Sequence, residues 1–596
     1  MVCRIDHPNT AQRIKNWDAG GGMDPAVVWG EIERFQEQGL ATTASLHGGA
    51  QEKALVLQFL QRVPMEALFG VLQWASDASD AKKVKITCAA IDRVLGSDAN
   101  EGMFFQPEMT PFIVAGLRHH EKAARVLSVN QLISHLKNQP TSEQSRALAN
   151  PMLLEELCSA MADEEVEVAS KAASVLDMVS VASSWVMAKG DLAEKDLWLC
   201  QLSSMEGEDY YKAIIDALHS TAQNDDISES SVEFARYLDA ISRISAKSEQ
   251  HTQHAIASGA IDIVGGQKDS CHEDILKCLK SNDALFVMNV LDLIPNLCQT
   301  TAGIVNILDS GTLQTLLNMS QDPLIGDSAL RLLGEISAAA AKRNVQSWNW
   351  SDPMLSKAFL STIESKMQSS DAQQIAAMDA IAAFASSSER AALVVLHIQY
   401  PTDSFTWNAE LNLLLQHKHM CKLLLVNGMS TNMPLKVNCF HTVARILGEP
   451  TRLNKQPDHV IAENATQWAL HERLFQALGP ECRHQTTMAL LMDCLRQPFD
   501  EIRIAVFTLL RAVAAQNNEW GVRVLLSYGG FFEFLLDRTT EPSKETREWK
   551  FAVVDAVLAS PFQQQLDATL LAKLQEHLRK GPYVGKGATE MELEAA

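Results

Sequence analysis

The sequence predicts an all-α protein made of stacked antiparallel helix pairs, and three observations support this. Apolar residues recur at helical spacing almost without a break from about Glu52 to about Leu578, and alternating strand-like runs are scarce. Short polar turns divide this pattern into helix-sized segments. Hydrophobic residues make up 46% of the chain but aromatic residues only 6%, and small or unbranched apolar side chains suit close packing of helix on helix.

The polar turns recur with a period near 40 residues. An aspartate precedes an apolar helix at Asp163, Asp283, Asp322, Asp371 and Asp500, and the first three are separated by 120 and then 39 residues. An aspartate at this position accepts hydrogen bonds from the free N–H groups of the next helix. HEAT and armadillo repeats have periods of about 40–47 residues. The chain is therefore predicted to be a HEAT/armadillo-like right-handed α-solenoid.

This pattern divides the chain into three parts. Residues 1–50, which are rich in glycine and hold one amphipathic stretch, are predicted to form a loosely ordered leader with one short helix. Residues 51–580 are predicted to form one continuous solenoid, with loops inserted near 343–353, 400–407 and 448–458. Residues 581–596 are expected to form a flexible acidic tail, in which the aromatic side chain of Tyr583 docks back on the last repeat.

Charge and cysteine usage narrow the class of partner. The 73 acidic residues outnumber the 51 basic residues, and the resulting formal charge of −22 argues against a nucleic-acid-binding surface. The eleven cysteines form no C-x-x-C pair, which indicates buried thiols in a reducing compartment. No signal peptide opens the sequence, and no apolar run approaches the roughly 20 residues that a membrane span needs. We expect a protein of the cytoplasm, and also of the nucleus, that is a monomer when free and binds no membrane.

No arrangement of residues predicts catalysis, a cofactor or a metal site. The most metal-like group is His417, His419 and Cys421 with His441 nearby, but on a helix residue 419 faces away from residues 417 and 421. The phosphate-loop, H-E-x-x-H and G-x-S-x-G patterns do not occur. We therefore expect the protein not to be an enzyme.

A recurring position inside the apolar helices suggests a binding surface instead. In several repeats one polar residue stands before a pair of aliphatic residues, and equivalent positions of stacked repeats form a column. Two more charged residues follow three or four positions later, on the same helix face. The candidate partner-binding residues are Asp292, Arg331, Glu335, Asp379, Arg445, Thr508 and Arg511. The alternative is that these side chains are solvated or form structural pairs between adjacent repeats, like the pair expected between Asp500 and Arg503.

The C-terminal end resembles a known family. Gly530-Phe-Phe-Glu-Phe-Leu-Leu-Asp-Arg538 is followed by a charged link, a helix at 550–558, and Gly581-Pro582-Tyr583-Val584 before the tail. This order is similar to the C-terminus of the family of 26S proteasome non-ATPase regulatory subunit 5, and the resemblance covers roughly the last half of the chain. It implies a HEAT/armadillo-like chaperone for assembly of the base of the proteasome regulatory particle. Family members bind the C-terminal domain of one ATPase subunit and leave before the finished proteasome forms.

Two other classes of protein remain open on the sequence. One is a different solenoid adaptor, such as a nuclear import receptor or a phosphatase scaffold. Armadillo import receptors carry Trp-x-x-x-Asn ladders, and none of the eleven tryptophans here has an asparagine four residues later, whereas no motif excludes a phosphatase-type scaffold. The other class is an enzyme. The proteins captured from a cell extract would separate these classes from the chaperone.

Overall fold

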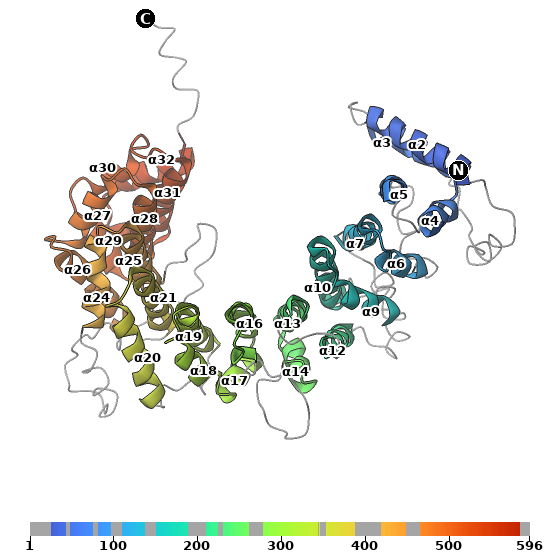
Figure 1. Cartoon of the computed structure of the whole chain (residues 1–596). Coiled ribbons are helices and arrows are strands. Elements are labelled where there is room, and N and C mark those ends of the chain that lie inside the picture. The colour runs from blue at the N-terminus through green and yellow to red at the C-terminus, as the bar shows by residue number, and fades with distance from the viewer. Residues whose placement is uncertain are drawn as a thin grey trace, which may run out of the picture. The chain divides into compact units, whose positions relative to one another are not determined.

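All regular structure in the described part of the chain is helical (Figure 1). A computed structural model describes residues 25–42, 48–74, 81–96, 110–137, 151–188, 210–223, 231–261, 278–343, 345, 353–387, 419–448 and 465–583. The chain divides into two compact units, Met1–Asp262 and Ile263–Ala596. The predicted all-α class is confirmed. The three predicted loop insertions and the acidic tail lie mostly outside the described residues, and the continuity of the solenoid from 51 to 580 stays a prediction.

The first unit is a stack of helix pairs. Its helices are α2 (Pro25–Thr42), α3 (Gly48–Arg62), α4 (Met65–Trp74), α5 (Ala81–Leu95), α6 (Thr110–Leu117), α7 (Lys122–Lys137), α9 (Pro151–Ala160), α10 (Val166–Ala188), α12 (Tyr210–Ala222), α13 (Val232–Ser245) and α14 (Glu249–Ala257). Within each pair, α4 packs on α5, α6 on α7, α9 on α10 and α12 on α13. The second helices then pack on one another in the order α5, α7, α10 and α13, so each pair buries its apolar faces against its neighbours.

The predicted leader is wrong for its second half, because α2 is part of the first unit. Val28, Ile32 and Phe35 on α2 are almost completely buried, and α2 packs on α3, α4 and α5. The rings of Phe35 and Phe59 stack with centroids 4.1 Å apart. Arg93 of α5 holds both neighbours: its Nη2 donates to Glu52 at 2.8 Å, and its guanidinium lies 4.1 Å from the Phe35 ring. The amphipathic stretch was predicted as a helix, but its glycine-rich surroundings did not indicate that its i, i+4, i+7 apolar face is buried in the first unit.

The second unit is a stack of longer helices with shorter ones beside them. Its helices are α16 (Ala284–Leu297), α17 (Thr301–Asp309), α18 (Thr312–Met319), α19 (Gly326–Lys342), α20 (Pro353–Lys366), α21 (Asp371–Ser387), α24 (Met420–Val426), α25 (Met433–Ile446), α26 (Ala465–Glu481), α27 (Thr487–Leu495), α28 (Asp500–Ala514), α29 (Glu519–Leu526), α30 (Phe531–Leu536), α31 (Lys544–Ala559) and α32 (Ala568–Lys580). We call α16, α19, α21, α25, α28 and α31 the long-helix row, because each packs on the next in that order.

Both repeat styles that the sequence left open occur. The first unit uses helix pairs, as in HEAT repeats, whereas α17–α18–α19 and α29–α30–α31 are armadillo-style groups of two short helices and one long helix. The chain reverses between the two short helices at Gly311 (φ 78°) and Gly530 (φ 84°), each of which precedes the second short helix. Only glycine adopts this left-handed conformation without a steric penalty.

The recurring aspartates act at the helix starts, although not in one way. Asp283 caps α16 by accepting from the backbone N–H groups of Leu285 and Phe286. Asp163 and Asp322 accept from backbone N–H groups two residues later, in the turns that precede α10 and α19. Asp371 and Asp500 are the first residues of α21 and α28, where a carboxylate favours the positive end of the helix dipole.

A buried arginine links successive repeats in both units. Arg503 of α28 donates to Glu541, in the turn before α31, through Nε and Nη2 at 2.8 Å each, and also to the carbonyl oxygen of Gln497 before its own helix. Arg125 of α7 does the same with Asp163 before α10. Both pairs are 38 residues apart. The expected pair of Arg503 with Asp500 is therefore wrong: the side chain spans one repeat instead of one helical turn.

We expect Arg503→Met to destabilise the second unit strongly. The side chains of Arg503 and Glu541 are 8% and 0% exposed, so the substitution leaves a buried carboxylate that has lost its main partner, and we expect the free energy of unfolding to fall by about 3–5 kcal/mol. Urea denaturation of the full-length protein measures this. The control is Arg579→Met, which breaks the exposed pair of Arg579 with Glu576 and should cost below about 1 kcal/mol. Equal losses in the two variants would contradict the role given to Arg503.

Candidate functional site

The seven candidate residues all lie on the long-helix row. Asp292 is on α16, Arg331 and Glu335 on α19, Asp379 on α21, Arg445 on α25, and Thr508 and Arg511 on α28. Because each of these helices packs on the next, residues at equivalent positions lie next to one another on the same surface. The seven side chains nevertheless have different surroundings.

Arg331, Asp379 and Arg445 form one cluster across three helices. The Nε of Arg331 donates to Oδ2 of Asp379 at 2.9 Å, and Nη1 of Arg445 lies 3.9 Å from Oδ1. Asn438 of α25 donates to the same Oδ1 at 3.2 Å. The carboxylate of Asp379 is thus largely satisfied within the protein. This geometry is the pairing between adjacent repeats that the sequence offered as the alternative, although all three charged side chains still reach solvent.

The two candidates on α28 are not open surface residues. Thr508 is 1% exposed, and its hydroxyl donates to the carbonyl oxygen of Ile504 on its own helix at 2.8 Å. A polar side chain in this column is expected to face solvent. A threonine whose hydroxyl bonds to its own helix can instead be buried without an unmet hydrogen bond, as Thr508 is. Arg511 is half-buried, and its guanidinium lies 6.0 Å from the centroid of the Trp549 ring of α31.

Asp292 and Glu335 are the two candidate carboxylates outside the cluster around Asp379. Both are exposed, and neither forms an ion pair within the described residues. Glu335 borders a hollow of about 400 Å³ between α16 and α19. The surrounding protein partly desolvates its carboxyl group, which raises the pKa of Glu335; Arg445 and Arg331 oppose this shift and Asp379 adds to it.

Two residues of α25 belong to this surface although the candidate set omitted them. Asn438 binds Asp379, as described above, and His441 shares the helix face of Arg445, four residues later. Burial lowers the pKa of His441, Arg445 lowers it further, and Asp379 opposes the shift. Asn438 and His441 precede Arg445 by seven and four residues, so helical spacing alone places them on the face of that candidate. Neither was included because the candidate column was built from other positions.

The described residues contain neither a metal-binding cluster nor a helix suited to cross a membrane. Among these, no group of three or more His, Cys, Asp or Glu side chains is placed to hold a metal ion, and His417 lies outside them. No helix there combines the length and hydrophobicity needed to cross a bilayer. The eight described cysteines are free thiols, and all except Cys421 are buried. Burial raises the pKa of Cys298 and of Cys482 to about 12.

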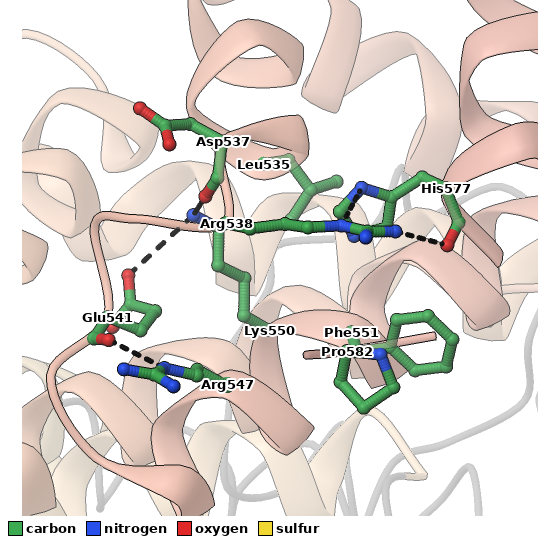
Figure 2. Close-up of a pocket in the computed structure, with 9 residues that line it drawn as sticks. All are labelled: Leu535, Asp537, Arg538, Glu541, Arg547, Lys550, Phe551, His577 and Pro582. Carbon is green, nitrogen blue, oxygen red and sulfur yellow. Dashed lines mark hydrogen bonds and ion pairs between the residues drawn. The ribbon is translucent and has the colours of Figure 1, made fainter. Parts of the chain in front are cut away.

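A second polar cluster closes the C-terminal end of the stack (Figure 2). Arg538 donates to the carbonyl oxygens of His577 (3.0 Å) and Tyr583 (3.5 Å), and the Tyr583 hydroxyl binds Glu548, so the predicted docking of Tyr583 is confirmed. The ammonium of Lys550 donates to the carbonyl oxygen of Asp537 at 2.6 Å. The enclosed volume is only about 10 Å³, enough for about one water molecule. This cluster therefore fixes the last repeat and has no room for a ligand.

Comparison with known proteins identifies the relatives of this chain. The sequence profile of the family described as "Proteasome non-ATPase 26S subunit" matches residues 218–595, more than half of the chain. The chain belongs to this family. It is 20% identical over 575 residues to 26S proteasome non-ATPase regulatory subunit 5 of Homo sapiens, covering 95% of this chain and 98% of the human protein. The protein of the same name from Bos taurus is 28% identical over 101 residues, 17% of this chain and 20% of the bovine one.

Alignments with two solved structures each cover about half of this chain. A designed armadillo repeat protein aligns with 50% of this chain and 99% of its own, at 16% identity and a TM-score of 0.29. An engineered protein aligns with 48% of this chain and 94% of its own, at 15% identity and a TM-score of 0.30. The assignment of a HEAT/armadillo-like fold therefore rests on the helix groups, the stacking order and the repeat-spanning pairs described above.

The last-repeat cluster predicts a pH dependence of stability. Burial, Arg538 and Lys550 together lower the pKa of His577 to about 4 from an ordinary value of 6.5. As the pH falls from about 6.5 to about 4, the unfolded chain binds a proton that the folded protein does not, so stability falls. The same direction holds for His251, His441 and His471, whose pKa values burial also lowers.

We expect His577→Asn to flatten part of this decline in melting temperature between pH 6.5 and pH 4. Asparagine does not titrate, and its amide oxygen can still face Arg538. The measurement is thermal unfolding at a series of pH values, with His484→Asn as the control histidine of the second unit. An unchanged slope in the His577 variant would show that this histidine is protonated in the folded state.

Proposed function

We propose that the protein is a non-enzymatic chaperone for assembly of the base of the proteasome regulatory particle. In this proposal it binds the C-terminal domain of an ATPase subunit and is released before the mature 26S proteasome forms. The observation that carries the proposal is the family match over residues 218–595, a range that contains the whole long-helix row. The relatives, which are named as regulatory subunits of the 26S proteasome, support an association with that particle.

The physical character of the row is compatible with a protein partner. Partly exposed arginines and exposed or partly exposed carboxylates occur together from α16 to α28 and supply both hydrogen-bond donors and acceptors. Such mixed-charge surfaces fix the orientation of a partner more than they add affinity. The net charge of −22 favours encounter with a partner that has a basic patch. We extend the proposal to a monomeric free protein located in the cytoplasm and the nucleus.

The test of the proposal is direct binding. Purified full-length protein is mixed with each ATPase subunit of the base, and the complexes are measured by analytical ultracentrifugation and titration calorimetry at micromolar concentration. We expect a reversible complex of one to one stoichiometry with one of these subunits. No complex with any of them, together with capture of import receptors or phosphatase subunits from cell extract, would replace the chaperone by the adaptor class.

The long-helix row itself is tested by neutralising its arginines. Arg445→Gln with Arg511→Gln should weaken the ATPase complex roughly 10- to 100-fold, about 1.4–2.8 kcal/mol, because both arginines are partly exposed and carry the positive charge of this surface. We choose glutamine because a glutamate at 445 would face Asp379. The control neutralises Arg496 and Arg579, which are exposed and lie outside the long-helix row. Equal affinity of the two double variants would exclude these arginines from the interface.

A further inference from the structure

A hollow lies between α16 and α19, at the first two helices of the long-helix row. Its volume of about 400 Å³ falls within the range of about 300–1,000 Å³ typical of binding sites. Pro295 of α16, with Cys298 and Gln299 directly after that helix, lines one side, and Leu332, Ala338 and Ala339 of α19 line the other. The two alanines leave the space between the helices open. Because Leu332 and Cys298 are almost completely buried, the wall of the hollow is firmly packed.

The charges around the hollow are arranged in two groups. Glu335 lines it, and Asp292 lies on the same face of α16 as Pro295, at i and i+3. Neither carboxylate has an ion-pair partner within the described residues. Lys342 and Arg343 lie at the other end, where Arg343 donates to the carbonyl oxygen of Gln299 at 3.0 Å. The acidic end of the hollow thus carries two exposed carboxylates that form no direct ion pair within the described residues, although Arg331 and Arg445 act on Glu335 through space.

Near the start of α16, two exposed apolar side chains lie on the same helix face as Asp292. Leu285 is 74% exposed and Met288 40% exposed. With Asp292 they occupy positions i, i+3 and i+7, which form one helix face. Aliphatic side chains this exposed are unusual for the first turns of a helix that otherwise buries its apolar residues. Apolar, acidic and hollowed surfaces therefore follow one another along α16.

We infer that this site receives one amphipathic helix of the partner, with a lysine or arginine placed between Asp292 and Glu335. A helix presents side chains at i, i+3, i+4 and i+7 and fits the groove between two packed helices. Its apolar side chains cover Leu285 and Met288, and one large side chain enters the hollow over Ala338 and Ala339. The inference rests on the proposed function, in which the helix belongs to the C-terminal domain of the bound ATPase subunit.

The experiment compares full-length variants for binding to the ATPase subunit that the unaltered protein binds. Asp292→Asn with Glu335→Gln removes the two carboxylates, and Ala338→Phe fills the hollow. The control, Asp309→Asn with Glu533→Gln, makes the same change of charge at exposed carboxylates of α17 and α30. We expect each site variant to weaken binding at least tenfold with an unchanged melting temperature. The double carboxylate variant should also lose most of the salt dependence of binding, and the control should retain both.

Each outcome decides between the two proposals. If the unaltered protein binds an ATPase subunit and the site variants bind it equally well, the site between α16 and α19 is overturned while the proposed function stands. If only Ala338→Phe weakens binding, with the salt dependence intact, the basic residue of the partner is overturned. If the unaltered protein binds no ATPase subunit, both proposals fail. A fall in melting temperature is resolved by Ala338→Ser, which does not fill the hollow and should bind like the unaltered protein.

Discussion

A buried arginine connects two successive repeats in each unit. Its guanidinium binds the turn before its own helix and also a carboxylate in the turn before the corresponding helix of the next repeat. Arg125 and Arg503 make this connection in the two units with the same separation of 38 residues. A buried guanidinium is tolerated only where several acceptors surround it. The arginine therefore accepts one arrangement of two turns, and the apolar helices between them pack within that spacing. A repeat that cannot bury its own surface is aligned with its neighbour in this way.

The same need to match charge organises the surface of the second unit. Where successive long helices bring opposite charges together, as at Asp379, the protein neutralises its own groups and leaves modest residual exposure. Asp292 and Glu335 are exposed and form no direct ion pair within the described residues, although Arg331 and Arg445 act on Glu335 through space. The row therefore has a directly paired cluster around Asp379 and two carboxylates outside it, on α16 and α19. A partner gains most where the protein has not already supplied the counter-charge.

The sequence was informative where the determining interactions are local. The helical period, the capping residue Asp283 and the aromatic anchor Tyr583 depend on residues near them in the chain, and all three were predicted. The partner of Arg503 is 38 residues away, and the burial of Thr508 depends on α25 and α31 beside α28, so no local pattern reveals either one. Helix α2 was predicted, but its packing into the first unit was not, because that burial depends on α3, α4 and α5. All seven candidate residues lie on the long-helix row. The sequence could not show which of their charges pair with one another, because those pairs join different helices.

The buried cysteines give the second unit a natural reporter of its own opening. Cys439 and Cys482 both direct their thiols at the carbonyl oxygen of Leu425, at 4.0 and 3.2 Å, and burial raises the pKa of both. Only the thiolate reacts rapidly with thiol reagents, so these two groups are inert while the helices around them stay packed. Their alkylation must then wait for the local separation of α24, α25 and α26. The rate at which Cys439 and Cys482 themselves are alkylated, resolved by peptide mapping, therefore reports the local opening of this part of the second unit without any introduced probe.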